Sequence, residues 1–430
     1  MMKMTWVTAA AVALGAAMTP LHAQEKPASV GVGVFTFTSG PAAAYGMPGK
    51  KAADLMVDQI NKAGGIAGVP IKATVVDEGQ GTEGVIAEYR RLASNPENQV
   101  MIAALSSSNC LALKPAVEQL KVPTIAWNCD AHQLLADGKS NYYFRPNGNT
   151  VTEFAAYALY LLQKNPNVKR VAMLNPDYAM GHDAANVFSA TLKAIRPDIE
   201  IVANLFPKLG TANFQTEVSR LLAAQPDVVF SALWGADLSN FVRQASPRGL
   251  FSKSQVILAL GETVLQQNTL PQGVIVGVLG DGWWMSPDAQ ARPETKRFVE
   301  EYKQRFGEYP VFPSMKMANA VIYMKDAYVK AMAANGGKWP SRDELAKAMS
   351  SGSFDTLTGT STIRKDNEGM VDQVIGTTVK SPDYSFPVIG DMVRYDGKVL
   401  TPPQGEDPMV WVKSINADLL KSLPKPGSYK

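Results

Sequence analysis

The sequence of 430 residues predicts an α/β fold in which parallel-rich sheets are flanked by helices. From residue 30 onward, apolar runs of strand length alternate with amphipathic stretches of helical length. This alternation is typical of parallel sheets that carry helices on both faces. The length also exceeds that of one ordinary domain, so we expect two.

The first strand, turn and helix set the pattern. Residues 30–37 form an apolar run, and a turn of small residues follows it. Residues 50–63 carry apolar side chains at helical spacing and end at Gly64, which suits a left-handed cap. The next strand covers residues 71–76. A strand, turn and helix in this order present backbone N–H groups at the carboxyl end of a sheet, where open α/β folds bind small ligands.

The later elements repeat this unit. Apolar runs predict strands at residues 100–105, 122–127, 171–174, 199–206, 228–233, 256–260 and 274–279. Amphipathic stretches predict helices at residues 111–120, 153–163, 214–224 and 238–245. Two further strands are expected at residues 371–379 and 387–395, before a proline-containing tail.

The first 23 residues have the pattern of a cleaved signal peptide. Lys3 supplies the positive start, residues 6–18 are apolar, and Ala23 ends a small-residue cleavage site. Because no later apolar run reaches the ~20 residues of a membrane span, we expect an exported, periplasmic protein without direct membrane insertion. Removing Lys3 lowers the net charge from +3 to +2, which is too small to indicate a nucleic-acid partner.

The chain has two cysteines, Cys110 and Cys129. Each follows a predicted strand, and consecutive parallel strands usually lie close together. In an oxidising compartment a disulfide between the two loops is plausible. The alternative is a pair of buried free thiols.

Motifs for catalysis are absent from the sequence. It contains no G-x-S-x-G, H-E-x-x-H or C-x-x-C pattern, and beyond the signal segment its histidines are His132 and His182. Gly49-Lys50 lacks the other residues of a phosphate loop, and the glycines at 31 and 33 lie inside a strand instead of after one. We therefore expect no enzyme activity, no cofactor and no metal.

Two polar loops follow predicted strands. Ser106, with two further serines, begins a helix, where hydroxyl and N–H donors favour a carboxylate ligand. Simple capping by Ser108 or Asn109 is the alternative. Asp130 has the spacing of a capping box with Gln133, which favours a structural role. Alternatively, Asp130 faces a ligand and favours a neutral or cationic group.

A family resemblance gives these loops a further meaning. The segments SGPAAAYG at 39–46, NKAGGIAGVPI at 61–71, DYAMG at 177–181, FQTEVSRLLAAQPDVVF at 214–230 and NFVRQASPRGL at 240–250 occur in this order. The chain thereby resembles the leucine/isoleucine/valine-binding proteins, the type I periplasmic solute-binding proteins of ABC importers.

The resemblance implies two similar lobes with a ligand cleft between them and three hinge crossings. We place the crossings near residues 144–149, 280–284 and 354–364. The first lobe would then contain residues 24–145 and 285–355. The second would contain residues 146–284 and 356–430.

The resemblance also implies a set of ligand contacts. Ser106 and the loop of Asn128 and Asp130 would hold a carboxylate, and Glu262 would bind an α-ammonium. On residue type alone, Glu262 reads as an exposed glutamate at a helix start. Aromatic side chains would line the cleft: Tyr45, Trp127, Tyr178 and Trp234.

Two positions depart from the family pattern. Asp130 replaces a small hydroxyl residue, and Met180 stands where a tyrosine is usual. The expected ligand is an apolar, branched-chain type amino acid, delivered to the permease and ATPase subunits of an importer. Alternatives are an aromatic carboxylate, with Trp283 added to the pocket, an amide or urea-like compound, or a sensory role.

Overall fold

The computed structural model describes residues 26–430, so the expected signal peptide lies outside the described residues. The first sheet has five parallel strands in the order β2-β1-β3-β4-β5. Their bounds are β1 Val30–Thr36, β2 Ile71–Asp77, β3 Asn98–Ile102, β4 Thr124–Ile125 and β5 Tyr143–Phe144. A doubly wound order of this kind places the loops after β1, β3 and β4 at one edge of the sheet.

The second sheet has seven strands in the order β15-β14-β10-β9-β8-β6-β7. Strands β6 to β10 run parallel, whereas β14 and β15 are antiparallel. The bounds are β6 Arg170–Leu174, β7 Glu200–Leu205, β8 Val228–Ser231, β9 Gln255–Leu258, β10 Ile275–Gly277, β14 Gln373–Val379 and β15 Val388–Tyr395. A small third sheet joins β11 Gly352–Asp355, β12 Thr360–Ile363 and β13 Gly369–Met370.

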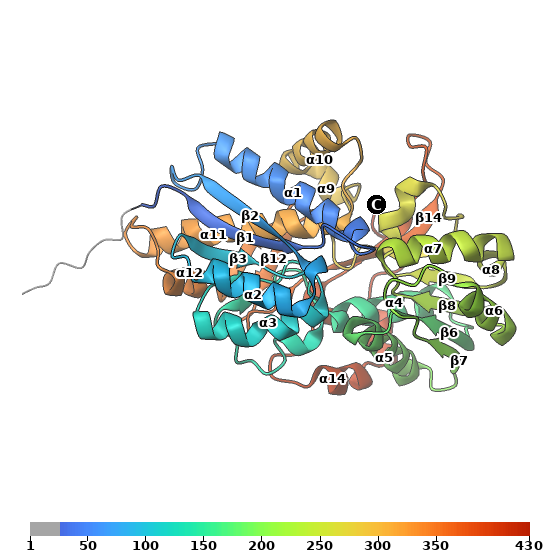
Figure 1. Cartoon of the computed structure of the whole chain (residues 1–430). Helices are drawn as coiled ribbons and strands as arrows, with labels where there is room; N and C mark the ends of the chain where they lie inside the picture. The colour runs from blue at the N-terminus through green and yellow to red at the C-terminus, as the bar shows by residue number, and fades with distance from the viewer. Residues whose placement is uncertain (1–25) are drawn as a thin grey trace, which may run out of the picture.

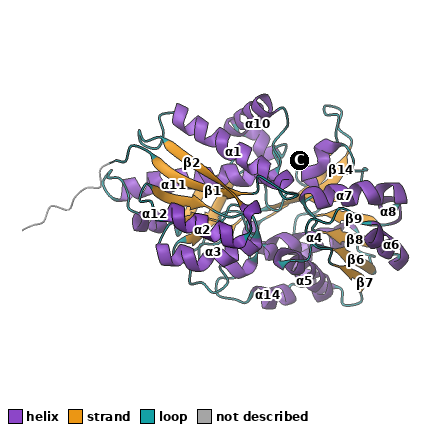
Figure 2. Cartoon of the chain, viewed as in Figure 1, coloured by secondary structure: helices purple, strands orange, loops and turns teal. Residues whose placement is uncertain are grey.

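Helices enclose both main sheets, which lie in different halves of the molecule (Figures 1 and 2). The α-helices are α1 Ala43–Lys62, α2 Thr82–Ala93, α3 Ser107–Leu120, α4 Thr150–Lys164, α5 Ala179–Ile195, α6 Gln215–Ala224, α7 Gly235–Ala245, α8 Leu250–Lys253, α9 Pro287–Ala291, α10 Pro293–Phe306, α11 Phe312–Ala334, α12 Arg342–Met349, α13 Gly397–Leu400, α14 Pro408–Ser414 and α15 Ala417–Ser422. The 3-10 helices are η1 Glu78–Gln80, η2 His132–Leu134, η3 Ser246–Arg248 and η4 Gly261–Gln267.

The two faces of the first sheet bury different side chains. Val32 and Val34 of β1 pack in the core that contains α1 and α11, whereas Phe35 packs in the core that contains α2 and α3. The alternation follows from the two-residue period of a strand. Within residues 26–430, no helix combines the length and the apolar character that a bilayer span needs.

The chain passes between the two main sheets more than once. Strand β5 of the first sheet leads to α4, which packs against β14 of the second. Strand β10 of the second sheet leads through α9 and α10 to α11, which packs against α1. The small sheet lies where the chain returns to β14, and Glu368 bridges to Arg145 beside the first passage.

The predicted α/β class and the predicted strands are confirmed, with changes at their ends. The apolar run 122–127 contains only the two-residue strand β4, because the following residues turn into a polar loop. Helix α1 begins at Ala43, earlier than the predicted residue 50, although Pro48 lies inside it. Helix α3 likewise begins at Ser107, four residues before the predicted start.

Candidate functional site

Aromatic side chains from both halves of the molecule meet in one cluster. Tyr45 lies in the first turn of α1, and Trp234 is the N-cap of α7, directly after β8. Their rings are 5.4 Å apart in an edge-on arrangement, and the ring of Phe312 packs 5.5 Å from Tyr45. Tyr178, the N-cap of α5, lies 6.5 Å from Trp234. Three of the predicted aromatic residues are therefore brought together by the fold.

The turn that presents Tyr45 is fixed by local contacts. The Asp77 carboxylate at the end of β2 accepts hydrogen bonds from the Thr38 backbone N–H and the Ser39 hydroxyl, at 2.9 and 2.5 Å. Gly46 is required because a Cβ atom there would lie 2.2 Å from the Phe37 carbonyl oxygen. The small residues of this turn thus allow α1 to start directly against β1.

The loop after β3 that contains Ser106 is held by hydrogen bonds to Glu78, a residue that was not identified from the sequence. The buried Glu78 carboxylate accepts the backbone N–H groups of Leu105 and Ser106, at 2.7 and 3.2 Å, and the Asn109 amide at 2.9 Å. Burial raises the pKa of Glu78 to about 7, although these three donors oppose the shift. The alternative of capping by Ser108 or Asn109 is wrong: Ser106 is the N-cap of α3, and no side-chain hydrogen bond caps this helix.

Trp127 and Asn128 have different surroundings. The Trp127 indole N–H donates to the Phe35 carbonyl at 2.8 Å, and its ring packs so closely under Gly49 of α1 that a Cβ there would be 2.7 Å away. Trp127 is thus a packing residue of the first half. Asn128 instead points to the aromatic cluster and donates to the Tyr45 hydroxyl at 3.2 Å. Its Oδ1 atom is buried and has no partner among the described residues.

The predicted capping box at Asp130 is wrong. The helix nearby is η2, its N-cap is Ala131, and no side chain caps it. Asp130 is buried and accepts a hydrogen bond from the Lys316 ammonium at 3.1 Å. A buried carboxylate is costly unless it is paired, and pairing with a lysine from α11 is favoured over capping an exposed turn.

Lys316 joins two carboxylates, and neither Lys316 nor the second carboxylate was identified from the sequence. Its Nζ atom also donates to Glu153 of α4 at 3.1 Å. Burial lowers the pKa of Lys316, but the charges of Asp130 and Glu153 outweigh that effect and raise it, so the lysine stays charged. A lone lysine in the apolar stretch of α11 was the available signal.

Glu262 lies at the start of η4, but it is not the exposed glutamate that its residue type suggests. Its side chain is buried, and its Oε2 atom accepts the Phe312 backbone N–H at 3.0 Å. Within residues 26–430, no lysine or arginine pairs with it. Burial consequently raises its pKa to about 8.

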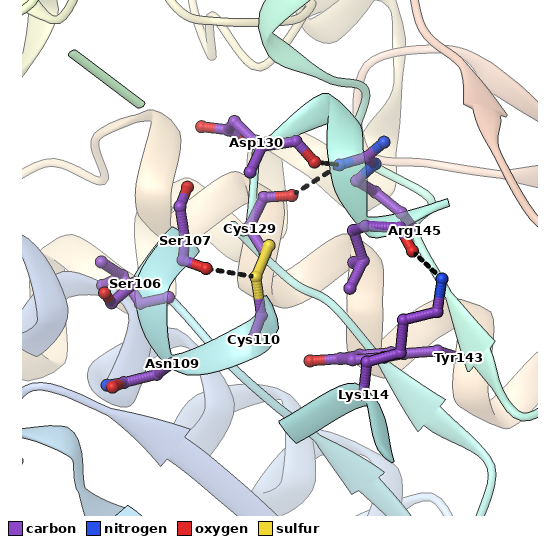
Figure 3. The surroundings of a disulfide bond; sticks show 12 residues. Ser106, Ser107, Asn109, Cys110, Lys114, Cys129, Asp130, Tyr143 and Arg145 are labelled. Carbon is purple, nitrogen blue, oxygen red and sulfur yellow. Dashed lines mark hydrogen bonds between the residues drawn. A yellow bond between two sulfur atoms is a disulfide. The ribbon is translucent and has the colours of Figure 1, made fainter. Parts of the chain in front are cut away.

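The predicted disulfide between Cys110 and Cys129 is confirmed, and it joins the two polar loops of the first half (Figure 3). The Cα atoms are 6.3 Å apart, and both cysteines are fully buried. Arg145 lies on the other side of the second loop, where it donates to the Cys129 carbonyl at 3.2 Å and pairs with Glu368. The disulfide and Arg145 together fix the loop that carries Asp130.

Met180 and the tryptophans near the second passage between the sheets are all buried. Met180 is buried in α5. Trp283 and Trp284 pack where β10 leads to α9, and Trp284 stacks on Tyr309 at 4.8 Å. Both tryptophans belong to the packing of this passage between the sheets.

A family model described as periplasmic binding protein matches residues 29–383. This chain is a periplasmic binding protein. The predicted resemblance to the type I, leucine/isoleucine/valine-binding group is confirmed by curated relatives. The Leu/Ile/Val-binding protein homolog 4 of Brucella melitensis biotype 1 is 25% identical over 338 residues, which cover 76% of this chain and 79% of the relative.

Solved structures show the same fold. A solute binding protein of an ABC transporter from Rhodopseudomonas palustris BisB5, in complex with 3,4-dihydroxy benzoic acid, superposes with a TM-score of 0.73 at 23% identity, covering 88% of this chain and 99% of that protein. The leucine-, isoleucine-, valine-, threonine-, and alanine-binding protein from Brucella ovis, in a closed conformation, gives a TM-score of 0.70 at 21% identity, covering 87% and 97%. The family and fold are those of solute-binding proteins, which are not enzymes.

Proposed function

We propose that this periplasmic binding protein is the substrate-binding component of an ABC importer and captures an amino acid with an apolar side chain. Its ligand would bind between the two halves, where Tyr45 and Trp234 face each other. The lobes would be residues 24–145 with 285–355, and 146–284 with 356–430. Closing them around the ligand would produce the form that a membrane permease and its ATPase recognise.

The buried Glu262 carboxylate carries this proposal. A carboxylate without a cationic partner in a desolvated site is a binding position for an ammonium group. A charge-assisted hydrogen bond of this kind contributes roughly 1.5–3 kcal/mol. Glu262 also bonds to the backbone of Phe312, whose ring packs on Tyr45, so the ammonium position lies beside the aromatic cluster.

The aromatic cluster supports an apolar side chain on the ligand. Tyr45 and Trp234 are buried, and Tyr178 is half-buried next to them. Such rings exclude water from an aliphatic group and add an attraction for a nearby ammonium. The Trp234 indole N–H is buried without a partner in the described chain, so it remains available to a ligand oxygen.

A ligand screen tests the proposal. The protein would be unfolded, stripped of copurified solute and refolded, and its thermal unfolding measured with the twenty amino acids, small amides and aromatic acids. A ligand at one hundred times its Kd stabilises the folded state by about 2.7 kcal/mol, which gives a clear shift. Stabilisation by leucine, isoleucine or valine is the expected result. Stabilisation by aromatic acids alone would contradict the role of Glu262.

The importer role needs a separate test. If permease and ATPase genes lie beside this gene, their purified products would be placed in lipid vesicles, and ATP hydrolysis measured with the binding protein present. Liganded protein should raise the hydrolysis rate more than unliganded protein. A receptor kinase gene in place of permease and ATPase genes would instead favour the sensory role.

A further inference from the structure

The proposed amino-acid ligand has a carboxylate, and two backbone donors of the loop after β3 are already used within the protein. The backbone N–H groups of Leu105 and Ser106 both donate to Glu78. The neighbouring loop carries the acidic Asp130. A buried basic side chain close to these loops would supply a further, charged donor for the carboxylate.

Two basic side chains, Arg145 and Lys316, are buried within residues 26–430. The donors of Arg145 are used in bonds to other protein groups. Arg145 pairs with Glu368 and donates to the carbonyls of Cys129 and Ala131. Lys316 is the other. Its ammonium group has three N–H donors, of which one goes to Asp130 and one to Glu153. One donor of Lys316 is left for a ligand.

Glu153 has a free position beside this lysine. Its Oε1 atom accepts from Lys316, whereas its Oε2 atom is fully buried and unpartnered in the part of the chain that the structure describes. Burial and the negative charge of Asp130 raise the pKa of Glu153 against the opposing charges of Lys316 and Arg145. A protonated Glu153 presents an O–H donor at Oε2.

These groups lie next to the aromatic cluster. The Lys316 Nζ atom is 5.8 Å from the centre of the Phe312 ring, which packs on Tyr45. The charges of Asp130 and Glu153 both contribute to the raised pKa of the Tyr45 hydroxyl, after burial as its main cause. Lys316 and Glu153 therefore lie near Tyr45 and Asn128.

We propose that Lys316 and the acid form of Glu153 together bind the carboxylate of the ligand. Lys316 donates its third N–H, and Glu153 donates its O–H from Oε2. Asp130 then balances the charge of Lys316 in the unliganded protein and positions the Lys316 ammonium group. Because the negative charge of Asp130 is paired with Lys316, it no longer opposes the binding of an anionic ligand. The inference rests on the proposed capture of an amino acid, and it identifies Lys316 as the specificity-determining residue for its carboxylate.

The test compares L-leucine with L-leucinamide by calorimetry at pH 6.5, where both carry an ammonium group but only leucine carries a carboxylate. Wild-type protein should bind leucine tenfold or more tightly, because the amide lacks the charge-assisted bond to Lys316. In Lys316→Met this preference should fall to about twofold or less. Lys330→Met, a half-exposed lysine on the same helix, should keep the wild-type ratio.

Two further variants separate binding from folding. Lys316→Met leaves Asp130 without its partner, so the double variant Lys316→Met with Asp130→Asn restores neutrality and should fold while showing the same loss of preference. Glu153→Gln keeps a donor at this position and should hold leucine within threefold of wild type. If Glu153 were instead an ionised acceptor for a ligand cation, Glu153→Gln would weaken leucine and leucinamide equally.

The outcomes distinguish the two proposals. If wild-type protein binds leucine but Lys316→Met and the double variant keep the wild-type preference over leucinamide, Lys316 has only a structural role. The proposed binding of the ligand carboxylate by Lys316 and Glu153, the carboxylate anchor, is then wrong. If wild-type protein binds leucinamide as tightly as leucine, the anchor is also wrong, but amino-acid capture stands. If it binds neither these compounds nor any carboxylate in the screen, amino-acid capture and the anchor both fail.

Discussion

Glu262 and Phe312 are joined by a hydrogen bond from the Phe312 backbone N–H to the Glu262 carboxylate, 3.0 Å long. Glu262 belongs to η4, which follows β9 of the second sheet, and Phe312 begins α11, which packs on α1 over the first sheet. The bond therefore crosses between the two halves. In this structure it also satisfies the one carboxylate that we assign to a ligand ammonium.

Replacing Glu262 with glutamine should weaken binding of the amino-acid ligand about tenfold or more, because one charge-assisted hydrogen bond becomes a neutral one. Calorimetric titration would measure the change in Kd. Wild-type protein should also release protons on binding at pH 7, since a bound ammonium stabilises the ionised form of a carboxyl whose pKa is about 8. Glu262→Gln should lose most of that release.

Glu83→Gln provides a matched control, because Glu83 is an exposed glutamate in the first turn of α2. It should bind the ligand as wild-type protein does. An unchanged Kd in Glu262→Gln would remove Glu262 from the binding site and leave the identity of the ammonium partner open.

The sequence could predict the fold because local patterns determine it. The apolar runs of β6 and β8 are buried on both faces, and such strands are visible as short apolar segments. Trp234 comes shortly after β8, and Tyr45 lies in the first turn of the helix that follows the similarly apolar β1. Residues at strand ends are thus placed as soon as the strands are assigned.

A second contact between the halves should control closure without touching the ligand. The Gln266 side chain donates to the Tyr309 carbonyl and accepts from its N–H, both at 2.9 Å. Gln266→Ala should destabilise the closed arrangement by about 1–2 kcal/mol, the net value of two hydrogen bonds. The apparent affinity for ligand should then fall roughly fivefold to thirtyfold, through the smaller closed population.

Small-angle X-ray scattering would show whether Gln266→Ala enlarges the unliganded protein while its liganded form keeps the wild-type radius of gyration. Gln267→Ala is the matched control, since Gln267 is exposed in the same 3-10 helix and bonds only to Ser239. Equal affinities for wild type and Gln266→Ala would show that this contact does not determine closure.

The disulfide should stabilise the fold and position the loop of Asp130. Its cysteines are 19 residues apart, and closing a loop of that length contributes roughly 3 kcal/mol through the unfolded state. The double variant Cys110→Ala with Cys129→Ala should lose about that much in chemical denaturation. Titration of denatured, unreduced wild-type protein should find no free thiol, whereas two thiols per chain would contradict the disulfide.

The charged part of the site could not be predicted from the sequence. Lys316 lies 186 residues from Asp130 and 163 residues from Glu153, so their meeting depends on how α11, α4 and the loop after β4 pack. Local spacing instead favoured a capping box for Asp130, which is the lower-energy choice only where no buried cation is available. A lysine in an apolar helix signals such a partner, but it does not identify which carboxylate it meets.

The buried carboxyls should make the unliganded protein less stable as the pH rises from 6 to 8. Glu262 has a pKa of about 8 when folded, against an ordinary value near 4.5, so between these values the folded state holds a proton that the unfolded state has lost. The free energy of unfolding therefore falls with rising pH across this window. For one such group the loss between pH 6 and 8 is about 2 kcal/mol. Glu78, with a pKa of about 7, and Glu153 act in the same direction.

Chemical denaturation of ligand-free protein at pH 6, 7 and 8 would measure this slope. Glu262→Gln removes one titrating group, so its stability should decline less steeply than that of wild type, by up to about 2 kcal/mol over the two pH units. Glu83→Gln should keep the wild-type slope, because its carboxyl is exposed. A wild-type stability that rises between pH 6 and 8 would mean that Glu262 is ionised throughout. A cation not yet identified would then have to balance its charge.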